Sequence, residues 1–304
     1  MEFPVRIGAP TSQKTSCAIL PIFEGRKIKG VTGEFNTAVK NQLSQLIRSG
    51  SSSTKLGQTL LVTQLEGVPA DKLLLVGCGK ESDFNAKRLS LAISAAAIEI
   101  SKAGIREATS YLAYGPVQGI SEYYASRLTV ETAKSVLYRF DEMKSRPLTK
   151  SRALRLAIAV NRREKAKEAR LGVSHGQAIS LGMDIARDLG NRPPNLCTPT
   201  HLANESKELA RTTKNLKTKI LSEQDMKSLG MGALLSVTRG AKEPAKFIVM
   251  EYQGGTEKDE TIVLCGKGIT FDTGGISLKP PPKMDEMKFD MCGAATVIGT
   301  MAAL

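Results

Sequence analysis

The residues best suited to chemistry lie in one glycine-rich loop near the end of the sequence. The apolar run 262–265 (IVLC) predicts a buried strand, and Gly266 and Gly268 interrupt it. The following loop carries these charged side chains: Lys267, Asp272, Lys279, Asp285, Glu286, Lys288 and Asp290. A buried strand that delivers lysines and carboxylates into a loop is a common way to build an active site on a rigid scaffold. Gly274 and Gly275 let such a loop fold closely around an ion or a substrate.

Two other interpretations of the loop compete with this one. A phosphate-binding loop needs a glycine five residues before its Gly-Lys pair and a Ser or Thr after it. Neither Gly266-Lys267 nor Gly79-Lys80 meets this rule at either position. The second alternative is a solvated surface, which is the usual place for charged residues.

The apolar neighbours of three charged residues argue against a plain solvated surface. Lys267, Asp272 and Lys279 stand among residues such as Phe271 and Leu278. This setting favours a functional role for the three. For the group formed by Asp285, Glu286 and Lys288, both interpretations stay open.

Composition sets limits on the type of protein. The chain has 304 residues, of which 41% are hydrophobic and 24% charged, which is typical of a soluble globular protein with two domains. Its apolar runs are shorter than the roughly 20 residues of a membrane span. Residues 1–16 lack the apolar core of a secretory signal. We therefore expect no membrane association.

Cysteine and histidine usage narrows the chemistry. The five cysteines are scattered and form no CxxC pair, which indicates free thiols in a reducing, cytoplasmic compartment. The only histidines are His175 and His201, and both are predicted to lie on helix surfaces. A metal site in this chain must therefore be built mostly from carboxylates.

The net charge of +13 raises the question of nucleic-acid binding. The densest basic segment, 162–170 (RREKAKEAR), has acidic residues interleaved at helical spacing, which is typical of a solvated helix. Tryptophan is absent and aromatic residues are few, so stacking platforms for single strands are not evident. DNA binding stays open as a secondary activity.

The first half of the sequence alternates between strand and helix patterns. Strands are predicted at 17–23, 60–64, 72–76, 110–114 and 153–160, and helices at 33–48, 83–103 and 121–138. The second helix has Ser82 or Asp83 as its cap and ends at Gly104, while Gly50 closes the first. This alternation predicts an α/β domain with a parallel or mixed sheet over residues 1–160. No catalytic group of residues stands out in it, so a regulatory or structural role is expected.

The second half begins with a long helix. Residues 161–189 have few helix breakers and predict a linker helix (domain segment 161–190) that stops at Gly190. Proline disfavours helix in the preceding residue, so Arg192-Pro193-Pro194-Asn195 predicts an extended turn. Thr198 and Pro199 then open a helix to about residue 209. Strands at 219–221 and 246–252, turns at 230–233 and 238–241, and an apolar segment at 291–304 complete the second domain, 191–304.

Several segments together resemble one enzyme family. They are NRPPN followed by TP, MGALLSVTRGAKEPAKFIVMEYQG, GKGITFDTGGISLKP and MDEMKFDMCGAA, with weaker matches at KLGQTLLV and YRFDEMKS. The sequence is similar to the leucyl aminopeptidases, cytosolic two-metal exopeptidases of the M17 metallopeptidase family. The resemblance covers nearly the whole chain, and FDTGGISLKP is its most specific part. It implies an α/β catalytic domain after the linker helix, peptide substrates with leucine preferred, and a homohexamer.

The resemblance also implies roles for individual residues. Lys267, Asp272 and Asp290 match metal ligands, and Asp272 is shared between the two ions. Lys279 matches a catalytic lysine that polarises the scissile carbonyl, and Met287 matches a residue that lines the pocket for the first side chain of the substrate. The substrate is thus expected to contact Met287, Lys279 and Asp272. Oxygen and amine ligands do not select strongly between zinc, manganese, magnesium and cobalt.

This sequence departs from the family pattern in two places. The family continues to a second motif, Asn-Thr-Asp-Ala-Glu-Gly-Arg, which supplies two more carboxylate ligands and a catalytic arginine and does not occur here. The sequence stops in the apolar stretch VIGTMAAL, so we expect a truncated catalytic domain with little or no activity of its own. The second departure is Pro280-Pro281-Pro282-Lys283, where the family has small residues and where the prolines stiffen the loop.

Two other functions remain possible from the sequence alone. One is a DNA-binding or regulatory protein that uses the basic surface. The other is a hexamer-assembly role for the first domain. Neither explains why Lys267, Asp272, Lys279 and Asp290 occur together in one loop.

Overall fold

The computed structural model describes residues 1–25, 28–48, 54–63, 65–146, 154–256 and 259–304. The chain divides into two compact units. Unit 1 consists of Met1–Arg139 and Arg146–Gln177, and unit 2 of Phe140–Ser145 and Ala178–Leu304. The division falls inside one long helix, α4 (Lys165–Asn191).

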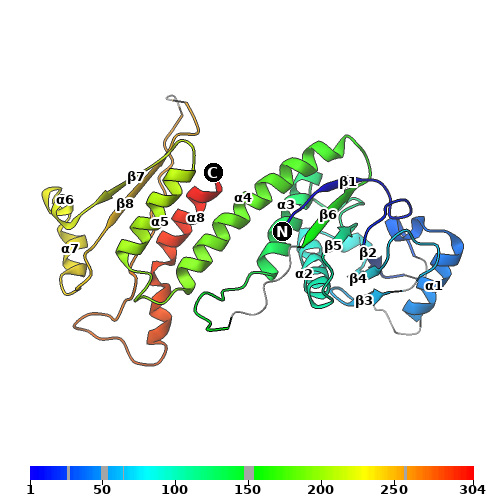
Figure 1. Cartoon of the computed structure of the whole chain (residues 1–304), viewed down its shortest axis with the longest axis horizontal. Coiled ribbons are helices and arrows are strands. Elements are labelled where there is room, and N and C mark those ends of the chain that lie inside the picture. The colour runs from blue at the N-terminus through cyan, green and yellow to red at the C-terminus, as the bar shows by residue number, and fades with distance from the viewer. Residues whose placement is uncertain (26–27, 49–53, 64, 147–153, 257–258) are drawn as a thin grey trace. The chain divides into compact units, whose positions relative to one another are not determined.

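Unit 1 is built on a six-stranded mixed sheet, which confirms the predicted α/β class (Figure 1). The strand order is β1-β6-β5-β2-β4-β3. All neighbouring pairs are parallel except β3 with β4. The strands are β1 (Val5–Ile7), β2 (Ala18–Phe23), β3 (Thr59–Val62), β4 (Leu73–Gly79), β5 (Glu107–Ser110) and β6 (Arg155–Val160).

Helices cover both faces of this sheet. On one face, η1 (Gly30–Glu34) and α1 (Thr37–Arg48) pack their buried apolar residues against Leu20 and Leu75. On the other face, α2 (Ala86–Lys102) and α3 (Glu122–Val136) pack against Ile19, Leu74 and Ile158. Both central strands are therefore buried from two sides, which explains why β2 and β4 are nearly continuous apolar runs.

The helix ends of unit 1 show where local signals were misjudged. The predicted cap of α2 was Ser82 or Asp83, but Asn85 accepts a hydrogen bond from the Arg88 backbone N–H, and Asp83 belongs to the short turn η2 (Glu81–Asp83). Asparagine is as good a cap as aspartate, so the sequence alone does not distinguish Asn85 from Asp83 as the cap of the helix. For α3, Ser121 caps the helix through the Tyr124 N–H as the sequence predicts. Gly50 lies outside the described residues.

One predicted strand is shifted. Residues 110–114 were expected to form a strand, whereas β5 covers Glu107–Ser110 and residues 111–114 form a buried turn. Tyr111 and Tyr114 are both buried, with their ring centroids 5.6 Å apart. Aromatic residues have high strand propensity, which is why the sequence predicts a strand here. In the structure the two tyrosines are buried in the apolar cluster that includes α1, without being in a strand.

The long helix α4 runs past its predicted end. It continues through Gly190 to Asn191. A side-chain Cβ at Gly190 would lie 3.1 Å from Sγ of Cys292, the first residue of α8 (Cys292–Ala303), so the glycine permits close packing with that helix. Gly190 was predicted to end the helix, but in the structure it lies within the helix and its lack of a side chain serves packing against another helix.

Unit 2 contains a two-stranded antiparallel sheet and several helices (Figure 1). β7 (Leu216–Leu221) pairs with β8 (Phe247–Tyr252), close to the two predicted strands. α5 (Pro199–Thr212) opens with Thr198 as its cap and Pro199 in its first turn, as predicted. The larger buried apolar cluster of the unit consists of Leu189, Cys197, Leu202, Met291, Ala295 and Ile298, and a smaller one of Leu221, Met226 and Ala245.

Two short helices in unit 2 were not predicted. α6 (Glu223–Ser228) begins with a capping box between Ser222 and Asp225, and α7 (Gly232–Thr238) covers part of a segment expected to be turns. The capping-box signal, Ser222 followed three residues later by an acid, is present in the sequence and was overlooked.

The strand expected at 262–265 is absent. These residues have no regular secondary structure and no described strand pairs with them. Ile262 and Val263 are 85% and 76% exposed. A strand needs a neighbour to satisfy its backbone groups, and β7 and β8 pair only with each other in the described part of the chain.

The final helix, α8 (Cys292–Ala303), follows the short helix η3 (Met284–Met291). Ala295 and Ile298 of α8 are buried in the core of unit 2. Among the described helices, none combines the length and the apolar character that a membrane span needs.

Candidate active site

The backbone around Lys267 is held against the start of α8. The Ala294 N–H donates a hydrogen bond to the Lys267 carbonyl at 2.8 Å. A Cβ at Gly266 would meet the Gly293 carbonyl oxygen at 2.4 Å, and a Cβ at Gly293 would meet the Lys267 nitrogen at 2.8 Å. Only glycines allow the two backbones to approach this closely. The pair therefore positions the Lys267 segment beside η3 and α8.

Four charged side chains of the loop form two ion pairs. Lys267 Nζ lies 2.7 Å from Asp290 Oδ2. Lys279 Nζ lies 2.8 Å from Asp272 Oδ2, to which it donates a hydrogen bond. The structure thus pairs predicted site residues that are as many as 23 residues apart in the sequence, as Lys267 and Asp290 are.

Met287 belongs to the same cluster. Lys279 Nζ also donates to the Met287 sulfur at 3.1 Å. The lysine head therefore lies between a carboxylate and a thioether. Lys279 therefore contacts both of the other residues predicted to bind substrate, Asp272 and Met287.

The turn that carries Asp272 is fixed by backbone contacts. The Gly274 N–H donates to Asp272 Oδ1 at 2.9 Å, and the Lys279 N–H donates to the Thr273 carbonyl at 2.9 Å. Gly274 and Gly275 have φ angles of 89° and 74°, in the left-handed region that favours glycine. Both glycines therefore serve the tight loop that the sequence indicates.

The two ion pairs act on each other. The hydrogen bond from Lys279 is the main cause that lowers the pKa of Asp272, and the Gly274 N–H and Lys267 lower it further. Contact with Asp290 is the main cause that raises the pKa of Lys267, with Asp272 adding to it. The four residues therefore form one electrostatic cluster in which both carboxyls are neutralised by lysines.

The cluster offers donors that suit a divalent cation. Asp290 Oδ2 is shielded from water and has the Lys267 ammonium 2.7 Å away. A divalent cation bound at this oxygen would take the place of that ammonium. Two carboxylates and one amine also match the oxygen and nitrogen preference of such ions.

The donor set is nevertheless small. In the described part of the chain, His, Cys, Asp and Glu side chains form no group of three that could hold a metal ion. Three donors cannot complete the shells of two ions that each take at least about four ligands. The residues present fit one part of a two-metal site.

The other charged residues of the loop lie apart from this cluster. Asp285 and Glu286 are exposed, and the Lys288 ammonium donates to the Asn191 carbonyl at 3.3 Å and lies 4.8 Å from the centre of the Phe289 ring. This favours a structural role for Lys288. Pro280, Pro281 and Pro282 are exposed, and Lys283 has a φ of 64°.

The NRPPN segment has a contact that sequence reasoning missed. Arg192 Nε donates to both carboxylate oxygens of Glu142, at 2.9 and 3.2 Å, and Arg192 Nη1 lies 2.8 Å from His201 Nε2. His201 lies on α5, as predicted, but it has this partner rather than a plain solvated position. Glu142 belongs to YRFDEMKS, so the two motifs hold the 140–145 segment within unit 2.

Comparisons with known proteins follow the same division of the chain. The profile of the "Cytosol aminopeptidase family, N-terminal domain" matches residues 19–147, and that of the "Cytosol aminopeptidase family, catalytic domain" matches residues 184–304. The second match contains the whole charged cluster. Together the two profiles cover most of the chain.

Longer bacterial proteins are similar over the full chain. A "Probable cytosol aminopeptidase" of Thioalkalivibrio sulfidiphilus is 43% identical over 305 residues, covering 100% of this chain and 62% of the relative. One of Paraburkholderia xenovorans is 44% identical, covering 96% of this chain and 57% of the relative. The chain thus spans about three fifths of the length of these relatives.

Solved structures show the same fold. The "Bottromycin maturation enzyme BotP in complex with Mn" is 28% identical with a TM-score of 0.74, covering 95% of this chain and 56% of that one. A "Tomato leucine aminopeptidase mutant - K354E" has a TM-score of 0.77 at 23% identity, covering 100% of this chain and 59% of that one, so it bears on the fold alone. On the two profile matches and the relatives, the chain belongs to the cytosol aminopeptidase family.

Proposed function

We propose an aminopeptidase function, in which N-terminal residues, with leucine preferred, are released from peptides at a site that holds two divalent metal ions. The observation that carries this proposal is the joint cluster of Lys267, Asp272, Lys279 and Asp290 in the part of the chain that matches the catalytic-domain profile. The similar enzyme BotP was solved in complex with Mn, which supports the use of a divalent ion. Zinc, manganese, magnesium and cobalt are all compatible with the donors.

The proposed metal ligands are Lys267, Asp272 and Asp290, with Asp272 shared. Divalent ions, when bound, polarise a carbonyl and lower the pKa of a coordinated water. In the structure Lys267 contacts Asp290 and Lys279 contacts Asp272. Lys267 can act as a ligand only as the neutral amine, so metal binding must remove its proton and separate it from Asp290.

Lys279 and Met287 are proposed to act on the substrate. Lys279 keeps its charge and stabilises the negative charge that develops on the scissile carbonyl oxygen, an effect worth about 10²–10³ in rate for a single well-placed donor. The Met287 side chain beside it supplies apolar surface for the first side chain of the substrate. Asp272 contacts Lys279 in this structure and keeps its ammonium oriented.

The ligand count leads to a second part of the proposal. The three donors present are too few for two ions, and the relatives are longer than this chain. We therefore propose that residues 1–304 alone have little or no peptidase activity. The remaining donors would come from sequence that corresponds to the unmatched two fifths of the relatives.

Hydrolysis assays test both parts. In the first assay, the 304-residue chain with manganese or zinc is given leucine anilide, beside the Lys279→Ala variant. We expect no turnover by either protein while circular dichroism shows both folded. Turnover that disappears in Lys279→Ala would contradict the claim that this chain lacks essential ligands.

The second assay uses a chimera in which residues 1–304 replace the corresponding part of the Thioalkalivibrio relative. We expect metal-dependent hydrolysis that falls about 10²-fold or more with Lys279→Ala. A folded chimera without activity, or one that Lys279→Ala leaves unchanged, would overturn the proposed aminopeptidase site. The unmodified relative serves as the positive control.

A further inference from the structure

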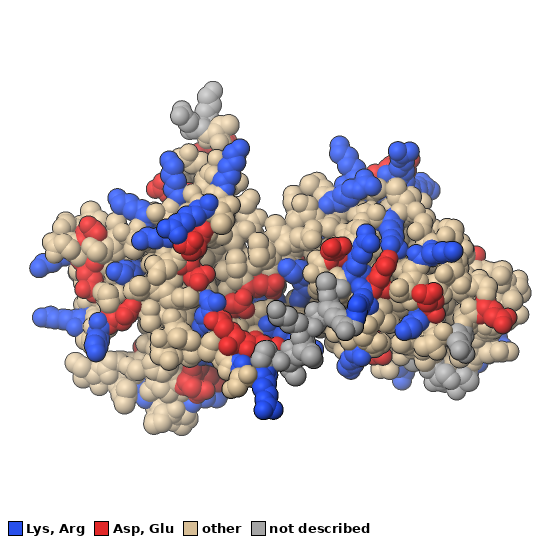
Figure 2. Space-filling view, in the orientation of Figure 1, with Lys and Arg blue, Asp and Glu red and all other residues tan. Residues whose placement is uncertain are grey.

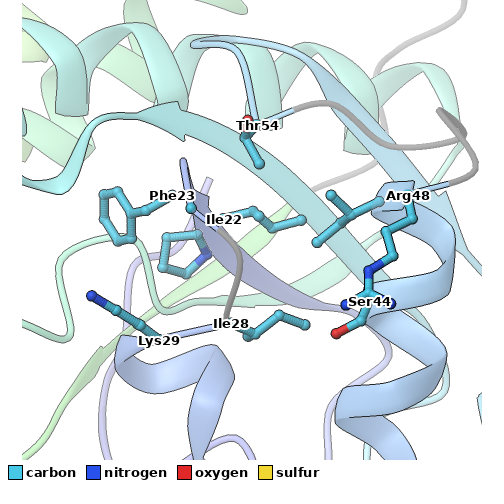
Figure 3. Close-up of a pocket in the computed structure, with 10 residues that line it drawn as sticks. Ile22, Phe23, Ile28, Lys29, Ser44, Arg48 and Thr54 are labelled. Atoms are coloured by element: carbon cyan, nitrogen blue, oxygen red, sulfur yellow. The ribbon is translucent and has the colours of Figure 1, made fainter.

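Unit 1 contains a cavity whose described lining includes none of the residues of the proposed peptidase site. Its volume is about 410 Å³, within the range of roughly 300–1,000 Å³ that small-molecule sites occupy. The residues that line it are Pro21, Ile22, Phe23, Gly25, Ile28, Lys29, Ser44, Ile47, Arg48 and Thr54 (Figure 3). All of them belong to unit 1, so the cavity can be considered within that unit alone.

The cavity lies beside the carboxyl end of β2. Pro21, Ile22 and Phe23 of this strand line it, together with residues of the segment that follows β2 and of α1. No residue of β5 occurs among the described lining residues, so the cavity lies on the α1 side of β2.

The floor of the cavity is apolar. Ile22, Ile28 and Ile47 line it together with the rings of Pro21 and Phe23. The Pro21 carbonyl is already bonded to the Thr32 hydroxyl at 2.7 Å, and proline has no N–H. This part of the backbone therefore offers little to a polar ligand, and the floor suits a hydrocarbon or ring.

Two cations border this floor. Lys29 follows Ile28, and Arg48 stands in the last turn of α1, one turn after the Ser44 hydroxyl. In Figure 3 the two cations come from opposite sides of the cavity, with Ile22 and Ile28 drawn between them. No carboxylate occurs among the described lining residues.

Four basic residues elsewhere in unit 1 are paired with carboxylates: Arg6 with Glu107, Arg88 with Asp83, Arg127 with Glu131 and Lys165 with Glu122. Neither Lys29 nor Arg48 contacts an acid among the residues that the structure describes. Two unpaired positive charges beside an apolar cavity favour a ligand with negative charge at both ends.

We propose that this cavity binds an elongated organic dianion, a molecule with two anionic groups separated by an apolar body. Lys29 binds one anionic end and Arg48 the other, with the planar guanidinium suited to a carboxylate or a phosphate. The isoleucine floor takes the body between them. The proposal does not depend on the aminopeptidase function.

Matched probes test the ligand class by calorimetric titration of the 304-residue chain. Suberate carries two carboxylates on a hydrocarbon chain, octanoate carries one on a chain of the same length, and 1,6-hexanediol bisphosphate carries phosphates at both ends. We expect a dianion to bind at least about tenfold more tightly than octanoate, because octanoate has only one anionic group and cannot contact both cations. The tighter of the two dianions identifies the preferred end group. Equal binding of suberate, bisphosphate and octanoate, or no binding of any, would overturn the proposal.

Variants locate the site. We expect Lys29→Gln and Arg48→Gln each to reduce dianion affinity to about the level of octanoate. The matched control Lys87→Gln, an exposed lysine on α2, should leave affinity within about twofold. Ser44→Leu fills the cavity without a change of charge and should weaken both dianions and octanoate. Dianion binding that survives Lys29→Gln, Arg48→Gln and Ser44→Leu in folded proteins would place it elsewhere and refute the proposal.

Discussion

At the residue scale, the site depends on how each charged group is partnered. Lys267 and Lys279 neutralise the two carboxylates that a cation would use. The loop can therefore stay folded without an ion, and a metal has to displace ammonium groups to bind. Metal affinity should thus fall as pH decreases, because the metal ion and the proton compete for the amine of Lys267.

Cysteine reactivity provides a residue-scale prediction. Burial raises the pKa of Cys17 to about 11 and that of Cys78 to about 12, whereas Cys265 is exposed. The thiolate is the reactive form, so at pH 8 the two buried thiols are almost entirely protonated. We expect iodoacetamide to modify Cys265 first and to leave Cys17 and Cys78 unmodified in the folded chain. Mass spectrometry of peptides after labelling measures this.

The control for that experiment is labelling in denaturant, where all cysteines should react at similar rates. Modification of Cys78 at the rate of Cys265 under native conditions would show that the β4 core opens far more readily than its burial implies. The account of unit 1 as a tightly packed sheet would then be wrong.

At the element scale, glycines decide how the helices of unit 2 meet. A Cβ at Gly299 of α8 would lie 2.3 Å from the Gly182 carbonyl of α4, and the reverse substitution is equally tight at 2.1 Å. The two helices therefore touch through their backbones. This contact fixes α8, and with it Gly293 and the Lys267 segment.

Gly299→Ala should destabilise unit 2. The added methyl group has no space, and overpacking of this kind costs about 1–3 kcal/mol. The matched control is Gly232→Ala in α7, where nothing lies within 4 Å of the added Cβ. There the gain in helix propensity should stabilise by up to about 1 kcal/mol. Urea unfolding measures both, and equal effects of the two substitutions would contradict the close α4–α8 contact.

Helix capping gives a second element-scale prediction. The Asn85 side chain accepts from the Arg88 N–H at the start of α2, so Asn85→Ala should cost about 1 kcal/mol in thermal or urea unfolding. Ser82→Ala, at the position first expected to cap the helix, should change stability by less than about 0.5 kcal/mol. The opposite ranking of the two variants would mean that Ser82 is the functional cap.

Much of the architecture could be predicted because its signals are local. The apolar runs of β2 and β4, the Ser121 and Thr198 caps and the α/β class follow from patterns within a few residues. Gly190 was misjudged because its role is a contact with Cys292, far away in sequence. The strand expected at 262–265 failed for a related reason, since an apolar run becomes a strand only where another strand pairs with it.

The sequence pointed to the residues that the structure brings into contact, but it could not predict how they pair, and their roles stay a prediction. The glycine-rich loop and its apolar neighbours pointed to Lys267, Asp272 and Lys279, and the structure brings Asp290 and Met287 to them. Which lysine contacts which carboxylate depends on the fold of η3. The close approach of Gly293 to the Lys267 backbone could not be predicted either, because it depends on where the fold places the start of α8.

At the scale of the whole molecule, the face drawn in Figure 2 does not show the continuous basic surface that nucleic-acid binding needs. In Figure 2, acidic and basic side chains are interspersed over the visible face of each unit, although the net charge is +13. Binding to duplex DNA should therefore be weak and steeply reduced by salt. A gel-shift titration at about 50 and 200 mM salt measures this. Tight binding that persists at the higher salt would revive the DNA-binding alternative.

The most direct test of the central claim is manganese binding to the 304-residue chain, followed by electron paramagnetic resonance of the free ion. The account predicts one Mn²⁺ bound per chain at millimolar manganese, with affinity reduced at least about tenfold by Asp272→Asn or Asp290→Asn. Asp285→Asn, an exposed carboxylate in the same loop, is the matched control and should change nothing. Equal manganese binding by all four proteins, or none by the unmodified chain at millimolar manganese, would contradict the assignment of these residues as metal ligands.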